Sequence, residues 1–234
     1  MSSEKSMPNM ESGIAEDAPT LPMSDRLLAG WEIASVTVSF LIAEWVVRPF
    51  GTGSKLIAAV PVSMALVVML VSHTSRQESR RDIGWRLDNF WAAMRLLLLP
   101  MGVATVAIAL LGFYSKGFQS TKWLEWRWLV WLPVWALIQQ YSLQGFINRR
   151  FQLILGKGYK SILAVAGVFA LLHMPNPFLM VATFLGGILW ATVYQRKPNL
   201  LALSISHAFI SLLLVFALPN SILSGLRVGF RYFR

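Results

Sequence analysis

Seven blocks of apolar residues, separated by short polar or charged segments, constrain this chain more than any other feature. Crossing roughly 30 Å of hydrocarbon takes about 20 helical residues, and a backbone inside lipid must satisfy its own hydrogen bonds. Transmembrane strands would need about 10 residues with strict alternation, which these blocks lack. We therefore predict an all-α, polytopic transmembrane bundle. Its expected spans are 27–47, 55–73, 91–113, 129–146, 161–174, 178–194 and 200–218.

The composition agrees with a membrane protein and divides the chain into two parts. Of 234 residues, 56% are hydrophobic and 14% are charged, unlike a soluble domain. Residues 1–24 are rich in Ser, Pro, Met and acidic residues, so we expect a disordered cytosolic tail before a transmembrane domain over 25–234. We expect no signal peptide, because the amino terminus is not basic and the first block lacks a small-residue cleavage pattern.

The formal charge of +10 comes from Lys and Arg clusters between the apolar blocks. Their asymmetry places the amino terminus in the cytosol, and we expect the protein in a bacterial cytoplasmic (inner) membrane. Seven spans would export the Arg-rich segment 219–234, which favours a short eighth span or a re-entrant segment, hence seven to eight spans. Nucleic acid is not an expected partner, because basic and aromatic residues do not interleave on a soluble surface. Without cysteine the chain has no disulfide, thiolate nucleophile or Cys-ligated zinc.

Two local predictions concern charged residues at the membrane boundary. Glu44 lies four residues before Arg48, so the two can form an ion pair on one helix face. Residues 74–90 are charged and amphipathic, which predicts an interfacial helix on the lipid surface. The apolar side chains available to that helix are Ile83, Trp85, Leu87 and Phe90.

Polar side chains in the later blocks mark the candidate site. In the stretch WALIQQYSLQGFINRRF, Gln140, Gln144 and Asn148 recur every four residues and form one stripe on a helix. His173 and His207 also lie within apolar runs, and polar residues inside a membrane are usually functional. One face of the last helix should carry Ser204, His207 and Ser211. We expect these residues to face one shared cavity.

Three motifs in this region resemble those of a known family. QQYSLQG at residues 139–145 aligns with EExxxRG, FALLH at 169–173 with FxxxH, and HAFIS at 207–211 with HxxxN or HxxxD. In order and spacing they resemble the CPBP or ABI intramembrane proteases, which include the type II CAAX prenyl endopeptidases. The resemblance covers about residues 124–218. It implies the membrane fold of that family and an endopeptidase activity.

The resemblance also assigns roles that this sequence has altered. In the family the second Glu of the first motif is taken as the base that activates water, helped by the histidines. Carried over by position, Gln139 and Gln140 stand at the two glutamates, Gln144 at the Arg and Ser211 at the Asn. A carboxamide cannot accept a proton at useful pH, so Gln140 cannot be a general base. Glu125 is the last acidic residue, so no later carboxylate substitutes.

The Glu and the Arg of the first motif are both replaced by Gln, and losing the two together avoids an unpaired buried charge. Removing the Glu alone would strand a buried Arg, at a cost of about 3 to 5 kcal/mol, whereas Gln at both places leaves a neutral cluster. We also expect no metal, because two histidines without a carboxylate or cysteine fall short of three zinc ligands, and no cofactor.

The sequence therefore leaves several functions open. One is a pseudoprotease whose cavity binds a lipid, a hydrophobic or prenylated peptide, or a partner helix. The second is an active endopeptidase in which His173 or His207 is the base and Gln140 positions the water. The third is a transporter or haem protein that uses the two histidines as a proton relay or as axial ligands.

Overall fold

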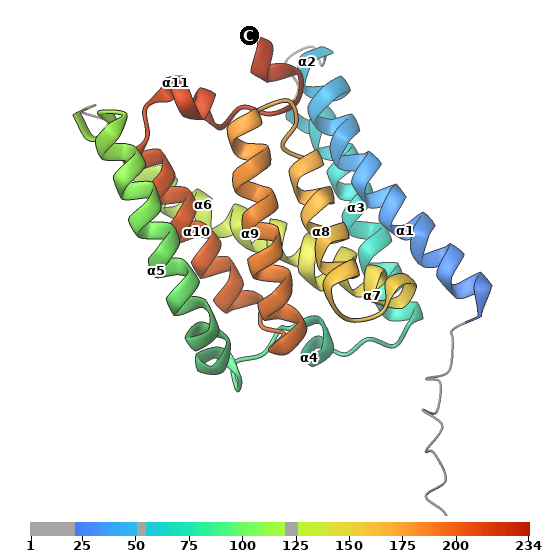
Figure 1. Ribbon diagram of the computed structural model, residues 1–234. Coiled ribbons are helices and arrows are strands. Elements are labelled where there is room, and N and C mark those ends of the chain that lie inside the picture. The colour runs from blue at the N-terminus through green and yellow to red at the C-terminus, as the bar shows by residue number, and fades with distance from the viewer. Residues whose placement is uncertain (1–21, 51–54, 120–125) are drawn as a thin grey trace, which may run out of the picture.

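The computed structural model describes residues 22–50, 55–119 and 126–234 and is an all-α membrane helix bundle (Figure 1). A helix lies in each of the seven predicted blocks, so the predicted all-α membrane helix bundle is confirmed. Residues 1–21 of the predicted cytosolic tail lie outside the described part. The helices are α1 (Met23–Ile42), α2 (Arg48–Phe50), α3 (Lys55–Ser75), α4 (Arg80–Ile83), α5 (Phe90–Tyr114), α6 (Trp126–Gln140), α7 (Arg149–Leu155), α8 (Tyr159–Leu171), α9 (Pro177–Arg196), α10 (Leu200–Ala217) and α11 (Asn220–Leu223).

Wider and tighter helical turns extend several of these elements. The π-helical segments η1 (Ala43–Val47) and η3 (Tyr141–Asn148) join α1 to α2 and α6 to α7. The 3-10 segments are η2 (Gly117–Gln119), η4 (Ser224–Leu226) and η5 (Gly229–Phe233). Within the described ranges, four helical stretches are long and apolar enough to cross a membrane. They are Met23–Val47, Phe90–Tyr114, Pro177–Arg196 and Leu200–Ala217.

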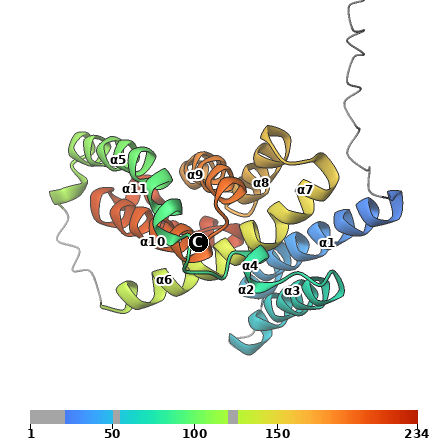
Figure 2. The same cartoon turned by 90° about the horizontal axis from the view of Figure 1, so that it is seen from below.

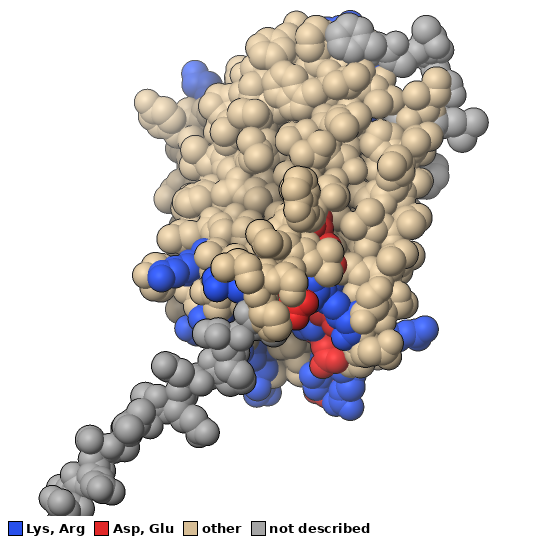
Figure 3. All heavy atoms as spheres, turned by 90° about the vertical axis from the view of Figure 1, so that its right-hand side faces the viewer, with Lys and Arg blue, Asp and Glu red and all other residues tan. Residues whose placement is uncertain are grey.

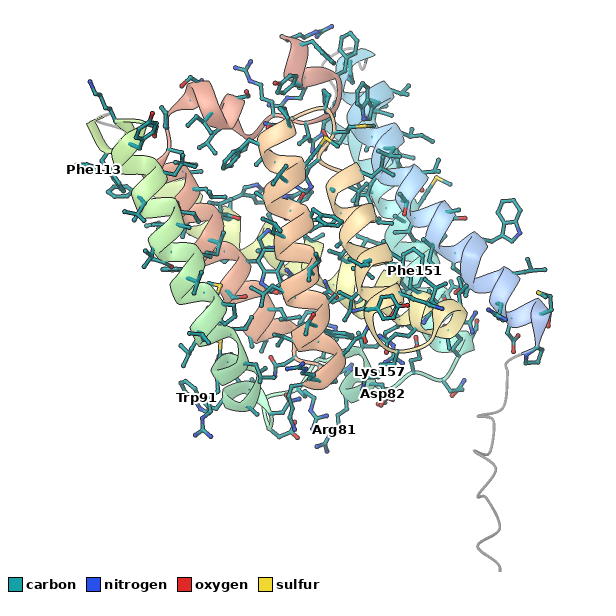
Figure 4. All side chains as sticks on the ribbon, in the orientation of Figure 1. Arg81, Asp82, Trp91, Phe113, Phe151 and Lys157 are labelled. Carbon is teal, nitrogen blue, oxygen red and sulfur yellow. The ribbon has the colours of Figure 1, made fainter. Side chains whose placement is uncertain are left out.

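The helices pack in neighbouring groups. Figure 2 shows α5, α9 and α8 side by side, with α10 and α6 below them in this view and the α1–α3 pair at one end. The α8–α9 contact is close because Gly187 has no side chain: a Cβ there would lie 2.8 Å from Ala166 Cα. Small residues allow such approach between membrane helices. Figure 4 shows Trp91 and Phe113 near opposite ends of α5, turned away from the bundle.

Two asparagines fix where α9 and α10 begin. Asn176 accepts from Leu179 N–H at 3.1 Å and Asn199 accepts from Ala202 N–H at 2.9 Å, so each caps the free amides of its helix. Asn199 is fully buried and also donates to the Arg86 carbonyl at 2.7 Å. This amide therefore attaches the start of α10 to the loop before α5.

Asn199→Ala is expected to lower the free energy of unfolding by about 2 kcal/mol or more, because it removes a cap and leaves buried backbone groups unpaired. Thermal unfolding in detergent measures the loss. Asn220→Ala, at the exposed first position of α11, is the matched control and should change little. Equal melting temperatures for the two variants would contradict this assignment.

The predicted interfacial helix over 74–90 is wrong. Only Arg80–Ile83 is helical after α3 ends; Ser79 and Asp82 form a capping box at its start, and Gly84, at φ 100°, ends it. Ile83 is 7% exposed and belongs to the main hydrophobic core, so it does not lie on lipid. The amphipathic pattern thus reflects a loop that packs one apolar side chain inward.

Residues 219–234, where an eighth span or a re-entrant segment was predicted, contain no helix long enough to cross a membrane. These residues form the short α11, η4 and η5, and the carboxyl end lies beside α2 (Figure 1). Asn176 donates to the Leu223 and Arg227 carbonyls at 3.0 and 3.2 Å, which fastens the segment to the start of α9. The predicted Glu44–Arg48 ion pair, at the same end of the bundle, is confirmed at 3.2 Å.

Candidate active site

The predicted amide stripe lies in the interior of the bundle. Gln140 ends α6, Gln144 lies in the π-helical η3, and Asn148 ends η3; all three are fully buried. The wider turns of a π-helix are frequent at functional sites. Because η3 packs against α8, α9 and α10, the amides lie beside α10, which carries His207, and beside α8, which leads into the turn that carries His173.

Gln140 and His207 are in direct contact. Gln140 Nε2 lies 3.2 Å from His207 Nδ1. The His207 imidazole packs against Trp190, with ring centroids 4.4 Å apart, and Trp190 Nε1–H donates to Ser206 at 2.9 Å. The histidine is therefore held between an amide and an indole, and none of its hydrogen bonds in the described residues involves a carboxylate.

His173 and His207 both pack against the ring of Phe169. The Phe169 ring centroid is 4.9 Å from that of His173 and 5.7 Å from that of His207, and both contacts are edge to face. His173 Nδ1 lies 2.8 Å from the Phe169 carbonyl. A carbonyl only accepts, so Nδ1 carries the proton, and Nε2 of the neutral ring is left as the acceptor.

The amide stripe continues to a residue that the sequence did not single out. Asn148 Nδ2–H donates to Gln144 Oε1 at 2.7 Å, and Gln195 of α9 donates to Asn148 Oδ1 at 3.1 Å. Gln140 Oε1 and Gln144 Nε2 are buried and have no hydrogen-bond partner among the described residues. The site thus presents two unsatisfied polar atoms on neighbouring turns of one helix.

The other predicted site residues do not take part in the hydrogen bonds that the structure describes between the amides and the histidines. Gln139 and Ser211 are half-buried on α6 and α10. The Ser204 hydroxyl donates to the Leu200 carbonyl of its own helix at 2.6 Å. In the described ranges, no group of three His, Asp or Glu side chains gathers as metal ligands would.

A buried charge cluster lies directly after η3 and was missed in the sequence. Arg150 of α7 is fully buried; it makes an ion pair with Glu32 of α1 at 2.8 Å and donates twice to Glu78 at 2.9 Å. Its guanidinium also lies over the Phe146 ring, 4.6 Å from the centroid. The doublet Arg149–Arg150 was the available signal, although a sequence does not show which carboxylates it meets.

Further basic groups complete this cluster. Arg76 lies 3.3 Å from Glu32, while Arg149 and His73 lie 2.6 and 2.5 Å from Glu78. Figure 3 shows acidic side chains among basic ones at this end of the molecule, below a largely uncharged surface, and Figure 4 labels Arg81, Asp82 and Lys157 there. The two carboxylates are therefore matched by cations.

Acid should weaken the cluster through Glu78. Burial alone would raise the pKa of this carboxyl, but hydrogen bonds from His73 and Arg150 hold its pKa well below the usual value. Because the pKa is lower in the folded state, ionised Glu78 stabilises the fold at pH values above its unfolded pKa of about 4.3. This stabilisation is lost as the pH falls below that value. The melting temperature should therefore drop below about pH 4, and Glu78→Gln should show a shallower drop. Identical acid profiles would contradict this contribution.

Comparison with known proteins gives one match. Residues 121–213 match the family model described as type II CAAX prenyl endopeptidase Rce1-like. This region is Rce1-like. It includes Gln140, His173 and His207, so the resemblance inferred from the three motifs is confirmed for the part of the chain that carries them. No curated protein and no solved structure matched the chain.

The match covers less than half of the chain, and this part of the membrane protein is similar to the type II CAAX prenyl endopeptidases. Helices α1 to α5 precede the matched region and supply Glu32 and Glu78, which neutralise Arg150. The buried charge cluster therefore joins the Rce1-like region to the rest of the bundle.

Proposed function

We propose that this membrane protein keeps the binding site of a CAAX protease-like fold without cleaving peptide bonds. Its site would hold a hydrophobic or prenylated peptide, a lipid or a partner helix. The observation that supports this most is the 3.2 Å contact between the Gln140 amide and His207, where the resemblance expects a carboxylate beside the histidine. An amide there can hydrogen-bond to a ligand or water but cannot take the water's proton.

The buried carboxylates do not supply the missing base. Glu32 and Glu78 are both ion-paired with Arg150, and each has a further arginine partner. Burial alone would raise the pKa of Glu78, but hydrogen bonds from His73 and Arg150 hold it well below its usual value, so this carboxylate is a poor proton acceptor.

A histidine base is the second candidate function. It is favoured by the geometry of His173, whose Nδ1–H donates to Phe169 and leaves Nε2 as an acceptor. The lone pair on Nε2 of a neutral imidazole can accept a proton from a water molecule. In that case Gln140 would position the water.

The two candidates predict different results from one assay. Purified wild-type protein in lipid nanodiscs is incubated with a prenylated CAAX peptide and with a generic transmembrane peptide, and mass spectrometry measures bound peptide and cleavage products. We expect bound, intact peptide. Cleavage that disappears in His173→Ala or His207→Ala would instead establish the second candidate, with Thr192→Val on α9 as the control variant.

A further inference from the structure

A backbone N–H group fixes the orientation of a series of buried side-chain amides that are linked by hydrogen bonds. The Gly158 N–H, at the start of α8, donates to Gln195 Oε1 at 2.9 Å. A backbone N–H can only donate, so this contact identifies the oxygen of the Gln195 amide and leaves Nε2 on the other side. Gln195 Nε2 then donates to Ser161 at 2.9 Å and to Asn148 Oδ1 at 3.1 Å.

The orientation of the Gln195 amide determines that of the Gln144 amide through Asn148. Because Asn148 accepts through Oδ1, its Nδ2 must donate, and it does so to Gln144 Oε1 at 2.7 Å. The remaining atom is Gln144 Nε2, whose N–H groups are fully buried without a partner among the described residues. An unsatisfied buried donor is costly. The series of hydrogen-bonded amides therefore ends at Gln144 Nε2–H, a donor that is held in place and has no acceptor among the described residues.

This donor carries no net positive charge. The nearest buried guanidinium in the sequence, Arg150, is matched by Glu32 and Glu78. A carboxylate brought to Gln144 would lose its hydration without gaining a counter-ion, whereas a neutral carbonyl loses much less. The motif alignment places an Arg here in the family, so the substitution changes the kind of acceptor that the position favours.

We propose that Asn148 and Gln195 are positioning residues that hold Gln144 Nε2–H toward a neutral hydrogen-bond acceptor of the ligand, such as an amide carbonyl, and thereby disfavour a free carboxylate. This rests on the proposed binding function. It adds two residues that the motifs do not include, and it defines the chemical group that the site selects.

Two probe peptides test the selectivity. They share one hydrophobic, prenylated sequence and differ only in a carboxamide or a carboxylate at the carboxyl end. Binding to wild-type protein in nanodiscs at pH 8 is expected to be about tenfold or more tighter for the carboxamide. Gln144→Leu should weaken carboxamide binding about fivefold to thirtyfold, since it removes one buried donor.

A double-variant cycle tests the positioning role. Gln195→Leu should give the same loss as Gln144→Leu, and the two together should give no further loss, because both act on one donor. Gln195→Glu keeps the side-chain size and the acceptor for Gly158 but cannot donate to Asn148 when ionised, so it should also weaken binding. Thr192→Val, whose hydroxyl bonds Ile188 on the same helix, is the control.

The outcomes separate this proposal from the function on which it rests. Equal affinity for both peptides, or additive losses in the two leucine variants, would overturn the positioning role and leave the binding function standing. Failure of wild-type protein to bind either peptide would overturn the binding function itself. Melting temperatures of all variants establish that the affinities belong to folded protein.

Discussion

Replacing Arg150 with methionine is expected to lower the free energy of unfolding by about 3 to 5 kcal/mol. The side chain is fully buried, and its removal leaves Glu32 and Glu78 in the interior with fewer cations. Methionine fills a similar volume, so the loss would come mainly from the uncompensated charges. Thermal or denaturant unfolding in a fixed detergent measures the effect.

The control for this variant is another ion pair at the same end of the molecule. Arg81 pairs with Asp88 at 2.7 Å, but the two side chains are 68% and 48% exposed. Exposed pairs contribute about 0 to 1 kcal/mol, so Arg81→Met should change stability little. Combining Arg150→Met with Glu32→Gln should recover part of the loss. A small effect of Arg150→Met would show that Glu32 and Glu78 do not need this partner.

The second large expected effect is a gain of cleavage in the double variant Gln140→Glu plus Gln144→Arg. It restores the acid and the cation at the positions aligned with the family motif, next to His207, which Gln140 already contacts at 3.2 Å. A positioned general base contributes about 10²- to 10⁴-fold in rate. We therefore expect the double variant to cleave a prenylated CAAX peptide that the wild type leaves intact.

The single variants serve as controls for the double variant. Each places one charge in a fully buried position without its partner, so each should be less stable than the double variant. Gln140→Glu with His207→Ala should not cleave. Cleavage by Gln144→Arg alone would show that the base is elsewhere.

The features that could be predicted from the sequence depend on residues close in the chain. Apolar length predicted the helices, and the four-residue spacing of Gln140, Gln144 and Asn148 predicted a buried stripe, because helix periodicity is local. The ordered motifs predicted that Gln140 and His207 face one cavity, and the structure brings the two side chains into contact. Whether these residues act on a ligand stays a prediction.

The features that were missed depend on contacts between distant segments. Glu32 lies in the first apolar block, far from Arg150 in the sequence, and only the packing of α1 against α7 brings the two together. Gln195, near the end of α9, had no pattern of its own, and its role follows from a backbone N–H at Gly158. The amphipathic segment 74–90 was misassigned because Ile83 packs into the core, which periodicity cannot distinguish from burial in lipid.

If the binding site is kept while the family's base is missing, restoring that base should produce cleavage. Mass spectrometry would measure the initial rate of product formation from a prenylated CAAX peptide with wild-type protein and with the Gln140→Glu plus Gln144→Arg variant, side by side in nanodiscs. We expect product from the double variant and none from the wild type above a protein-free blank. Product from the wild type at a rate equal to that of the double variant would contradict it.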